Sequence, residues 1–561
     1  MGVPGFFAWL LKNNTHNNII LHNLDNINCL YFDANCLFHP KCFDILKLHS
    51  QITDINKLEN LMIERIIKYI QYIINFTNPT DLIYIAVDGV APIAKINQQR
   101  KRRYKSIIDN KFMQELNKKY NKNKNDSWSN IVITPGTDFM IKLDIALTKY
   151  ISTFKNIKFI YSSYKECGEG EHKIIRYIKS QNEKYKKKHV IYGLDADLIF
   201  LAMSAHNNIN DMYLLREFNH IKNINTEITE EVNEKLCYVV INNVINTYNE
   251  YILNKLQDTA DILDIDFTDK NNKFDFSQDF IILCFLLGND FIPNLPSINI
   301  RNYGIEFLTE AYCKMFCYTN TYMYDIKLNK LNLHNFKLIL DYLTDLEHEY
   351  FSQILPQYQK KFRNKKFNGL DDYERDIFNR DNLNNIQKNN NIKLGEDTKD
   401  LYKFRYYEYN FNSRINQYKM IDKICHNYID MIHWIINYYF DVNMPSWRFN
   451  YQFNHSPFAS DILNYLNNNK FVDNKYWNFD IKYEESVPIE TQLICIIPPQ
   501  YNNIFNKNIQ KKYNKILLSN ITKFMLPKHI EIEYDKEMYW MCEPKLPLLD
   551  IELLNIELLD I

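Results

Sequence analysis

The 561-residue chain has few glycines, 11 in all, and no pair of cysteines in a C-x-x-C arrangement. Its 11 cysteines are scattered along the sequence. Cys313 and Cys317 share one face of an expected helix, but no nearby histidine or second cysteine pair completes a zinc site. This usage favours free thiols in a reducing compartment over a disulfide framework.

Sorting and membrane signals are also missing. The N-terminal stretch MGVPGFFAWLLK has no basic region before an apolar core and no small-residue cleavage site, unlike a signal peptide. It begins with Met-Gly, but Phe6 occupies the position where a myristoylation signal has Ser or Thr. No apolar run approaches membrane-spanning length. We therefore expect a soluble intracellular protein with no membrane partner, in the cytoplasm rather than the nucleus.

The chain has almost no net charge, with a formal value of −1. The net charge therefore gives no sign of a nucleic-acid partner. Any basic surface must be local, with acidic residues elsewhere offsetting its charge. Hydrophobic residues make up 46% and charged residues 24%, a globular composition. The length can bury a large core and suggests two or more domains.

Short apolar runs alternate with helical segments in the first half of the chain. Strands are expected at Leu30–Phe32, Asp81–Val87, Lys158–Ser162, His189–Leu194, Met212–Arg216 and Cys237–Ile241, with helices at Leu58–Ile74, from about Ala91, and at Asp138–Ser152. The alternation predicts an α/β fold with a mainly parallel sheet flanked by helices. The rest is helix-rich, with a polar stretch at Asp381–Asp400. We expect three parts, residues 1–320, 321–400 and 401–561.

Acidic side chains stand at the ends of these elements. They are Asp33, Asp88, Glu169, Glu171, Asp195, Asp197 and Asp290. Taken singly, each could cap a turn or a helix. If the strands are parallel neighbours, most of these acids share one edge of the sheet and need a cation to offset their repulsion. Oxygen ligands suit Mg²⁺ or Mn²⁺, and two such ions ~3.5–4 Å apart serve phosphodiester hydrolysis. Spacing alone leaves scattered caps as an equal alternative.

A basic helical face follows Asp88. Lys95, Gln99, Arg102 and Arg103 stand at i, i+4, i+7 and i+8 in APIAKINQQRKRRYK, which places them on one side of a helix. Three cations and an amide donor could form a pocket for a terminal phosphate. A solvated charged face is the alternative, and KRRYK could also serve as a nuclear-localisation patch.

These segments closely resemble the XRN-type 5′→3′ exoribonucleases. The matching stretches are MGVPGFFAWL, FDANCLFHP, VDGVAPIAKINQQRKRRYK, CGEGEHKIIRYI, YGLDADLIFLAMSAH, LLRE and FLLGNDFIPNLPS, followed by WIINYYF, PSWRFNYQFNHSPFASD and QLICIIPP in the second region. They follow the family's order over nearly the whole chain. The resemblance implies a PIN-like α/β nuclease domain, with a second helix-rich α+β region (residues 401–561) packed against it and bracing its active site.

The resemblance also assigns roles to residues. The seven acids match the family's catalytic metal ligands and imply two Mg²⁺ or Mn²⁺ ions. Lys95, Gln99, Arg102 and Arg103 match its 5′-monophosphate pocket. His39 matches a residue that stacks on the 5′ nucleotide, and Trp540 its stacking partner, although each could instead be structural. Stacking suits an enzyme indifferent to sequence. The implied substrate is single-stranded RNA with a 5′-monophosphate, acted on by a monomer; no protein partner is indicated.

Three positions depart from the family pattern. Cys36 stands where Gly is usual, Ile93 replaces an Arg, and Cys167 replaces a Pro before GEGEH. None removes a ligand, so activity is expected. Two other functions stay open at this point. One is a structure-specific 5′ nuclease acting on DNA flaps, and the other is an inactive protein that binds RNA ends.

Overall fold

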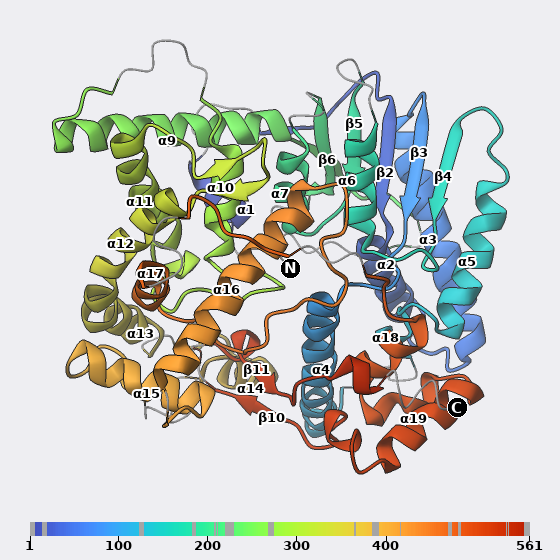
Figure 1. Ribbon diagram of the computed structural model, residues 1–561. Coiled ribbons are helices and arrows are strands. Elements are labelled where there is room, and N and C mark those ends of the chain that lie inside the picture. Colours follow the sequence, from blue (N-terminus) through green and yellow to red (C-terminus); the bar gives the residue numbers. More distant parts are fainter. Residues whose placement is uncertain are drawn as a thin grey trace. The chain divides into compact units, whose positions relative to one another are not determined.

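The computed structural model describes residues 6–13, 19–122, 128–181, 187–206, 209, 211–218, 229, 231–267, 274–363, 366–383, 392–415, 417–468, 474–480, 484–534, 536 and 538–554 (Figure 1). The first five residues of MGVPGFFAWL and residues 384–391 of the expected polar linker lie outside this set. Two compact units are present. We call residues 17–244, 484–531 and 544–561 the sheet unit, and residues 1–16, 245–483 and 532–543 the helical unit.

The sheet unit begins with alternating strands and helices. Its elements are β1 (Ile20–Leu21), β2 (Cys29–Asp33), α2 (Ala34–Leu48), α3 (Ile55–Thr77), β3 (Leu82–Ala86), α4 (Ile93–Lys119), η1 (Asn130–Val132), α5 (Asp138–Ile151), β4 (Lys158–Ser162), α6 (Gly170–Ser180), β5 (His189–Tyr192), α7 (Asp197–Ser204), β6 (Met212–Glu217) and β7 (Leu236–Val240). The expected strands are all present, within a few residues of their predicted ends.

The strands form one seven-stranded sheet in the order β1-β7-β6-β5-β2-β3-β4. Strands β6, β5, β2, β3 and β4 are parallel, whereas β7 and β1 run antiparallel at one side. The predicted mainly parallel, helix-flanked sheet is therefore confirmed. In the register, Phe32 of β2 pairs with Ile85 of β3 and with Tyr192 of β5, so the three strands end at nearly the same level.

The sheet is covered on both faces, which explains why its central strands are apolar along their whole length. Alternate residues such as Phe32 and Ile85 join a core with α2, α3 and α5. Residues of the opposite parity face α6, where the ring of Tyr84 lies 5.2 Å from that of Tyr177. Figure 1 shows α6 on one side of the strands and α3 and α5 on the other.

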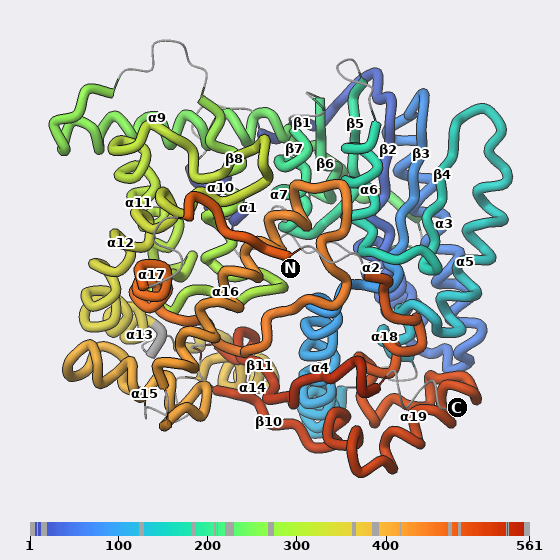
Figure 2. The backbone as a smooth tube through the Cα atoms, in the orientation of Figure 1, coloured from blue at the N-terminus to red at the C-terminus, as the bar shows by residue number. Residues whose placement is uncertain are grey.

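The C-terminal part of the chain returns to the sheet unit and packs along α4 (Figure 2). This part contains α18 (Ile489–Ile496), η5 (Pro499–Ile504), α19 (Lys507–Leu518) and η6 (Lys523–Met525). The guanidinium of Arg100 is buried here and donates to the carbonyl oxygens of Pro547 and Met525. One side of α4 is thereby fixed, which leaves its other side for the basic face.

The helical unit contains most of the remaining elements. They are α1 (Phe6–Asn13), α9 (Ile241–Leu263, entered from the sheet unit), α10 (Ser277–Phe285), η2 (Ile300–Asn302), α11 (Gly304–Thr319), β8 (Tyr324–Asp325), β9 (Lys330–Leu331), α12 (Leu333–Glu349), the π-helical turn η3 (Tyr350–Ile354), α13 (Leu355–Arg363), α14 (Asp372–Asp381), α15 (Lys399–Phe411), α16 (Gln417–Phe440), α17 (Ala459–Asn467) and η7 (Tyr539–Met541). The short strands β10 (Glu531–Glu533) and β11 (Glu543–Lys545) stand at the unit boundaries.

A buried ionic network ties three helices of the helical unit together. Glu347 of α12 is fully buried and accepts hydrogen bonds from the backbone N–H and the hydroxyl of Ser460. The ammonium of Lys403 lies 3.5 Å from Glu347 and 3.7 Å from Asp461, and Tyr407 donates to Asp461 at 2.7 Å. Each carboxylate therefore has a cation or a hydroxyl donor, as buried charges require.

The predicted division into residues 1–320, 321–400 and 401–561 stays a prediction. The two compact units interleave along the chain, because residues 484–531 and 544–561 return to the sheet unit. None of the described helices is both long and apolar enough to cross a lipid bilayer.

Candidate functional site

Four acids stand where β2, β3 and β5 end. Asp33 is the last residue of β2 and directly precedes α2, and Asp88 follows β3 by two residues. Asp195 lies in the turn after β5, and Asp197 begins α7. Because these parallel strands end level with one another, their acids share the carboxyl edge of the sheet, where open α/β folds place their sites.

The first turn of α6 adds two more acids to the same place. Glu169 directly precedes Gly170, and Glu171 follows it. The backbone N–H of Gly170 donates to Asp88 Oδ1 at 2.7 Å. A Cβ atom at Gly170 would stand only 2.9 Å from Asp33 Oδ1, so the glycine permits the close approach of helix and acids. The sheet unit therefore brings six of the seven predicted acids together.

Burial and repulsion from neighbouring acids favour the protonated forms of Asp33, Asp88 and Glu171. Burial raises the pKa of Asp33 well above its ordinary value, with further increases from the charges of Asp88, Asp195 and Glu169. The pKa of Asp88 rises to about 6, chiefly through burial, and burial also raises that of Glu171. Most acids of the cluster are buried or partly buried, whereas Asp195 is exposed.

Lys95 of α4 is a cation that reaches these acids. Its ammonium lies 2.8 Å from Glu169 Oε1, and its charge lowers the pKa of Asp33, Asp88 and Glu171. The helical spacing predicts Lys95 at one end of a phosphate-binding face; the structure also makes it a counter-charge to the acid cluster. Lys173 of α6 lies beside Asp88 as well, where it donates to the carbonyl oxygens of Val87 and Ser163.

The donor set of the cluster fits a hard divalent cation in its chemistry. All six side chains offer carboxylate oxygens, and Glu171 Oε2 is buried with no hydrogen-bond partner among the described residues. Within that described part of the chain, however, no group of three or more His, Cys, Asp or Glu side chains is arranged so that it could hold a metal ion. Metal binding at these acids stays a prediction.

The basic face of α4 continues from Lys95 towards solvent. Gln99 and Arg103 are partly buried, Arg102 is exposed, and Arg103 donates to the carbonyl oxygen of Ile131 at 3.2 Å. His39 of α2 lies beside the two arginines: burial, Arg103 and Arg102 together lower its pKa to about 4. The predicted phosphate-binding and stacking residues of the sheet unit are thus close together.

Asp290 and Trp540 belong to the helical unit, and their part in the site stays a prediction. Asp290 follows α10 in a loop shaped by Asn289, whose side chain accepts from the N–H groups of Phe291 and Ile292. Trp540 is 46% exposed, and the guanidinium of Arg301 lies over its ring at 4.6 Å from the centroid. A half-exposed aromatic ring of this kind suits stacking on a base.

Sequence reasoning assigned no role to three neighbours of the acids. Asn35 accepts a hydrogen bond from the backbone N–H of Asp88 at 3.1 Å. Cys36, which stands where the family usually has Gly, donates to the carbonyl oxygen of Asp33 and leaves β2 and α2 joined normally. Arg216 of β6 donates to the carbonyl oxygen of Asp195. The signal for Asn35 is its place in the matching stretch FDANCLFHP. The signal for Arg216 is that a charged residue ends an otherwise apolar strand.

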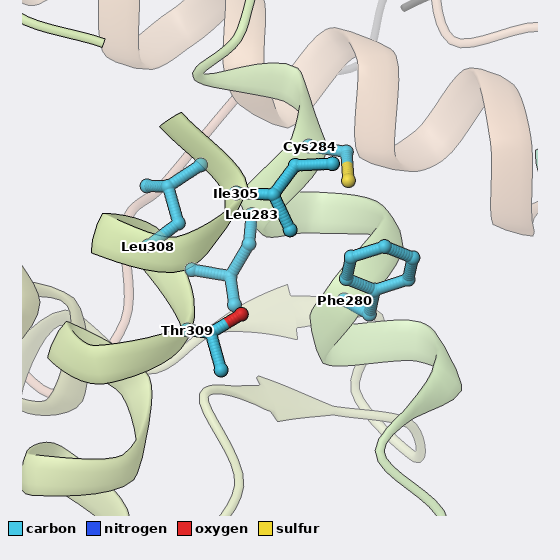
Figure 3. A pocket seen from close by; sticks show the side chains of 6 residues that line it. All are labelled: Phe280, Leu283, Cys284, Ile305, Leu308 and Thr309. Atoms are coloured by element: carbon cyan, nitrogen blue, oxygen red, sulfur yellow. The ribbon is translucent and has the colours of Figure 1, made fainter. Parts of the chain in front are cut away.

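A small pocket elsewhere does not compete with this site. It lies between α10 and α11 and is lined by Phe280, Leu283, Cys284, Ile305, Leu308 and Thr309 (Figure 3). No lining residue is charged, and Figure 3 shows a single hydroxyl, on Thr309. Such a lining is a packing gap of an apolar core and offers nothing to a phosphate.

Comparison with known proteins agrees with this arrangement. A family model described as "XRN 5'-3' exonuclease N-terminus" matches residues 1–218, and one described as "Xrn1 helical domain" matches residues 272–376 and 371–561. The chain belongs to the XRN family. The two matches cover the acid cluster, the basic face of α4, the Asp290 loop and Trp540.

Curated relatives of the XRN family align over long stretches. The chain is 26% identical to human 5'-3' exoribonuclease 1 over 561 residues, which are 90% of this chain and 31% of that protein. It is 26% identical to 5'-3' exoribonuclease 2 of Arabidopsis thaliana over 701 residues, an alignment that covers 98% of this chain and 66% of that protein. It is 31% identical to 5'-3' exoribonuclease 1 of Saccharomyces cerevisiae over 370 residues, an alignment that covers 62% of this chain and 23% of that protein. The chain thus spans only about a third of the human relative's length.

Proposed function

We propose that this XRN-family protein is a 5′→3′ exoribonuclease that removes nucleotides one at a time from single-stranded RNA carrying a 5′-monophosphate. The observation that carries the proposal is the cluster of six carboxyls at the carboxyl edge of the sheet, with the basic face of α4 beside it. Acids and a phosphate-binding face together fit a reaction that grips one phosphate and cleaves at the next.

The acid cluster would hold Mg²⁺ or Mn²⁺, in a set of two ions. The residues proposed for this are the six acids of the cluster, Asp33, Asp88, Glu169, Glu171, Asp195 and Asp197, and in addition Asp290, as the sequence predicts. When bound, such ions activate a water molecule and stabilise the leaving oxygen in phosphodiester hydrolysis. The raised pKa of Asp33 and Asp88 fits the proposal, since a divalent cation would offset the repulsion that now disfavours their ionised forms.

The basic face selects the RNA end. Gln99, Arg102 and Arg103 would donate to the oxygens of the terminal phosphate, and Lys95 would add a charge between that phosphate and the acids. A guanidinium gives forked, charge-assisted hydrogen bonds, which a 5′-hydroxyl end cannot accept with equal strength. A cap or triphosphate would place extra groups against the partly buried Arg103 and be excluded for lack of room.

Two aromatic rings would hold the first nucleotide. His39 has a pKa lowered to about 4, so its ring is neutral at pH 7 and can stack on a base without a charge of its own. Trp540 of the helical unit is the second proposed platform. Every base presents a π-face, and stacking contributes roughly 1–3 kcal/mol per base, so this grip is indifferent to sequence. We propose that the active species is a monomer.

Three RNAs identical except at the 5′ end, carrying a monophosphate, a hydroxyl or a cap, provide the test. Each is incubated with the full chain and Mg²⁺, Mn²⁺ or EDTA, and released nucleotides are measured. We expect degradation of the monophosphorylated RNA alone, in either metal but not in EDTA. Equal degradation of all three ends would refute the end selection.

The same assay separates the other functions. A labelled DNA flap included as a fourth substrate would be cut preferentially by a structure-specific DNA nuclease. A protein that binds 5′-monophosphorylated RNA without releasing any nucleotide would instead be an inactive end-binding protein. Either outcome would replace the proposed function.

A further inference from the structure

The carboxyl end of β6 lies directly against the Asp195 turn. Tyr192 of β5 pairs with Leu215 of β6, and the next β5 residue, Gly193, donates from its N–H to the Leu215 carbonyl at 3.4 Å. Beyond this point β5 gives way to the turn that carries Asp195, whereas β6 continues with Arg216 and Glu217. Two charged residues therefore end a strand whose other residues are apolar, beside the acid cluster.

Arg216 fixes the turn through its backbone. Its Nη2 donates to the carbonyl oxygen of Asp195, and the residue is 6% exposed. Asp195 is an exposed residue, and the bond from Arg216 uses its main-chain oxygen and not its carboxylate. Burying a guanidinium has a high desolvation cost, so its interactions at this position must offset that cost.

Glu217 fixes the end of β6 from the neighbouring position. It accepts hydrogen bonds from the hydroxyls of Tyr69 in α3 and Tyr192 in β5. The ammonium of Lys41 in α2 lies 3.3 Å from Glu217 and 2.5 Å from Glu234. α2 starts directly after Asp33, so the same network holds the helix that leads away from a second acid of the cluster.

We propose that Arg216 is a positioning residue, which sets the main chain of Asp195 so that its carboxylate can join a divalent cation, with Glu217 anchoring the strand end from which Arg216 acts. This inference deepens the proposed function and rests on it for the role of Asp195. Residues that orient metal ligands in this way commonly change metal affinity 10–100-fold when they are replaced.

Mn²⁺ binding measured by calorimetry on the full chain without RNA tests the proposal. In Arg216→Met the donor is lost while much of the side-chain volume stays, and we expect Mn²⁺ to bind at least about tenfold more weakly. Charge alone predicts the opposite, because removing a cation near the acids would tighten Mn²⁺ binding. Arg216→Lys keeps a donor and the charge, and we expect it to recover most of the affinity.

Arg100→Met is the matched control. Arg100 is also a buried arginine that donates to backbone carbonyls, those of Pro547 and Met525. We expect this variant to lose thermal stability as Arg216→Met does, yet to bind Mn²⁺ like the wild type. Wild-type affinity in folded Arg216→Met would overturn the proposal, as would an equal loss of affinity in Arg100→Met.

A structure of the wild-type chain with Mn²⁺ decides the matter if the variants do not fold. We expect the bond between Arg216 and the Asp195 carbonyl to persist with the Asp195 carboxylate on the ion, and an Arg216 turned away from Asp195 would overturn the inference. Wild-type protein that degrades RNA and binds Mn²⁺ while Arg216→Met matches it would refute this inference alone. Wild-type protein that binds no Mn²⁺ would refute the proposed metal centre with it.

Discussion

Two groups of buried acids in this molecule differ in how their charges are matched. In the helical unit, Glu347 and Asp461 share Lys403 and accept from Ser460 and Tyr407. In the sheet unit, six carboxyls gather near Lys95 and Lys173. Burial raises the pKa of both Glu347 and Asp33, but the next largest influence on Glu347 is Lys403, which lowers its pKa, and that on Asp33 is Asp88, which raises its pKa. Removing one partner from a hydrogen-bonded buried network destabilises a fold, whereas acids that repel one another lower stability unless a cation binds. We therefore expect the excess of acids in the sheet unit to serve function rather than stability.

The largest expected effect is on catalysis by the sheet unit. Replacing Asp195 by Ala removes the exposed acid of the cluster, and we expect degradation of 5′-monophosphorylated RNA to fall about 10³-fold, roughly 4 kcal/mol of barrier. RNA binding should persist, because the basic face of α4 is unchanged. Single-turnover degradation and a binding assay measure the two. Asp211→Ala, at an exposed residue just before β6, is the control. Equal turnover by Asp195→Ala with added Mg²⁺ would contradict the metal assignment.

A substitution in the buried network of the helical unit should lower stability and leave turnover unchanged. Glu347→Ala removes the acceptor of the Ser460 N–H and hydroxyl and one of the two carboxylates beside Lys403, and we expect it to lower the free energy of unfolding by about 3 kcal/mol. Activity per folded molecule should not change. Urea unfolding and turnover measured at a temperature where the variant is folded check both parts. A loss of turnover in the folded variant would remove the distinction between the two acid groups.

The pH dependence of stability sharpens the contrast. The pKa of Asp88 is raised from 3.8 to about 6, so its contribution to stability is present below about pH 4 and is lost as the pH rises through about 6. In EDTA we expect a loss of about 2 kcal/mol between pH 4 and pH 7 that Asp88→Asn lacks. The difference between the two proteins in urea unfolding measures it, and excess Mg²⁺ at pH 7 should restore the loss. No difference between them would contradict the charge excess.

A smaller effect is expected on the choice of RNA end. Arg102→Ala removes an exposed guanidinium of the basic face, and we expect the preference for 5′-phosphate over 5′-hydroxyl ends to fall about tenfold, roughly 1.4 kcal/mol. Lys111→Ala on the same helix, also exposed, serves as the control. The ratio of kcat/KM for the two ends measures the preference. An unchanged ratio would count against the phosphate pocket.

The smallest effect concerns the departure from the family pattern at Cys36. Its thiol donates to the Asp33 carbonyl, and the residue lies inside α2. Cys36→Gly should lower the free energy of unfolding by no more than about 1 kcal/mol, the ordinary effect of glycine inside a helix, and change turnover less than about threefold. Thermal unfolding and initial rates check it. A large loss of turnover would mean that Cys36 shapes the acid cluster.

The sequence predicted the strand ends well for a physical reason. A short apolar run that ends at an acid, as before Asp33, Asp88 and Asp195, is typical of a buried strand. Because these strands are parallel, their carboxyl ends and acids lie at the same edge of the sheet. The spacing of Lys95 gave its helical face but not its ion pair with Glu169, because helical geometry fixes direction and not the reach of a flexible side chain.

Long-range arrangements were beyond the sequence patterns. Nothing local in LLRE shows that Arg216 reaches the Asp195 carbonyl or that Glu217 meets Lys41, since those contacts depend on which strand becomes the neighbour of β5. The return of residues 484–531 to the sheet unit is likewise set by packing between segments far apart in the chain. Such contacts follow from the fold as a whole.

The most direct measurement uses RNA whose 5′-monophosphate carries a radioactive label. The full chain is added with Mg²⁺ or with EDTA, and the labelled product is sized from the first time point. We predict that the label appears at once as a 5′-mononucleotide in Mg²⁺ and stays on intact RNA in EDTA. Label released as oligonucleotides, or as mononucleotide equally in EDTA, would contradict a metal-dependent 5′→3′ exoribonuclease at the carboxyl edge of the sheet.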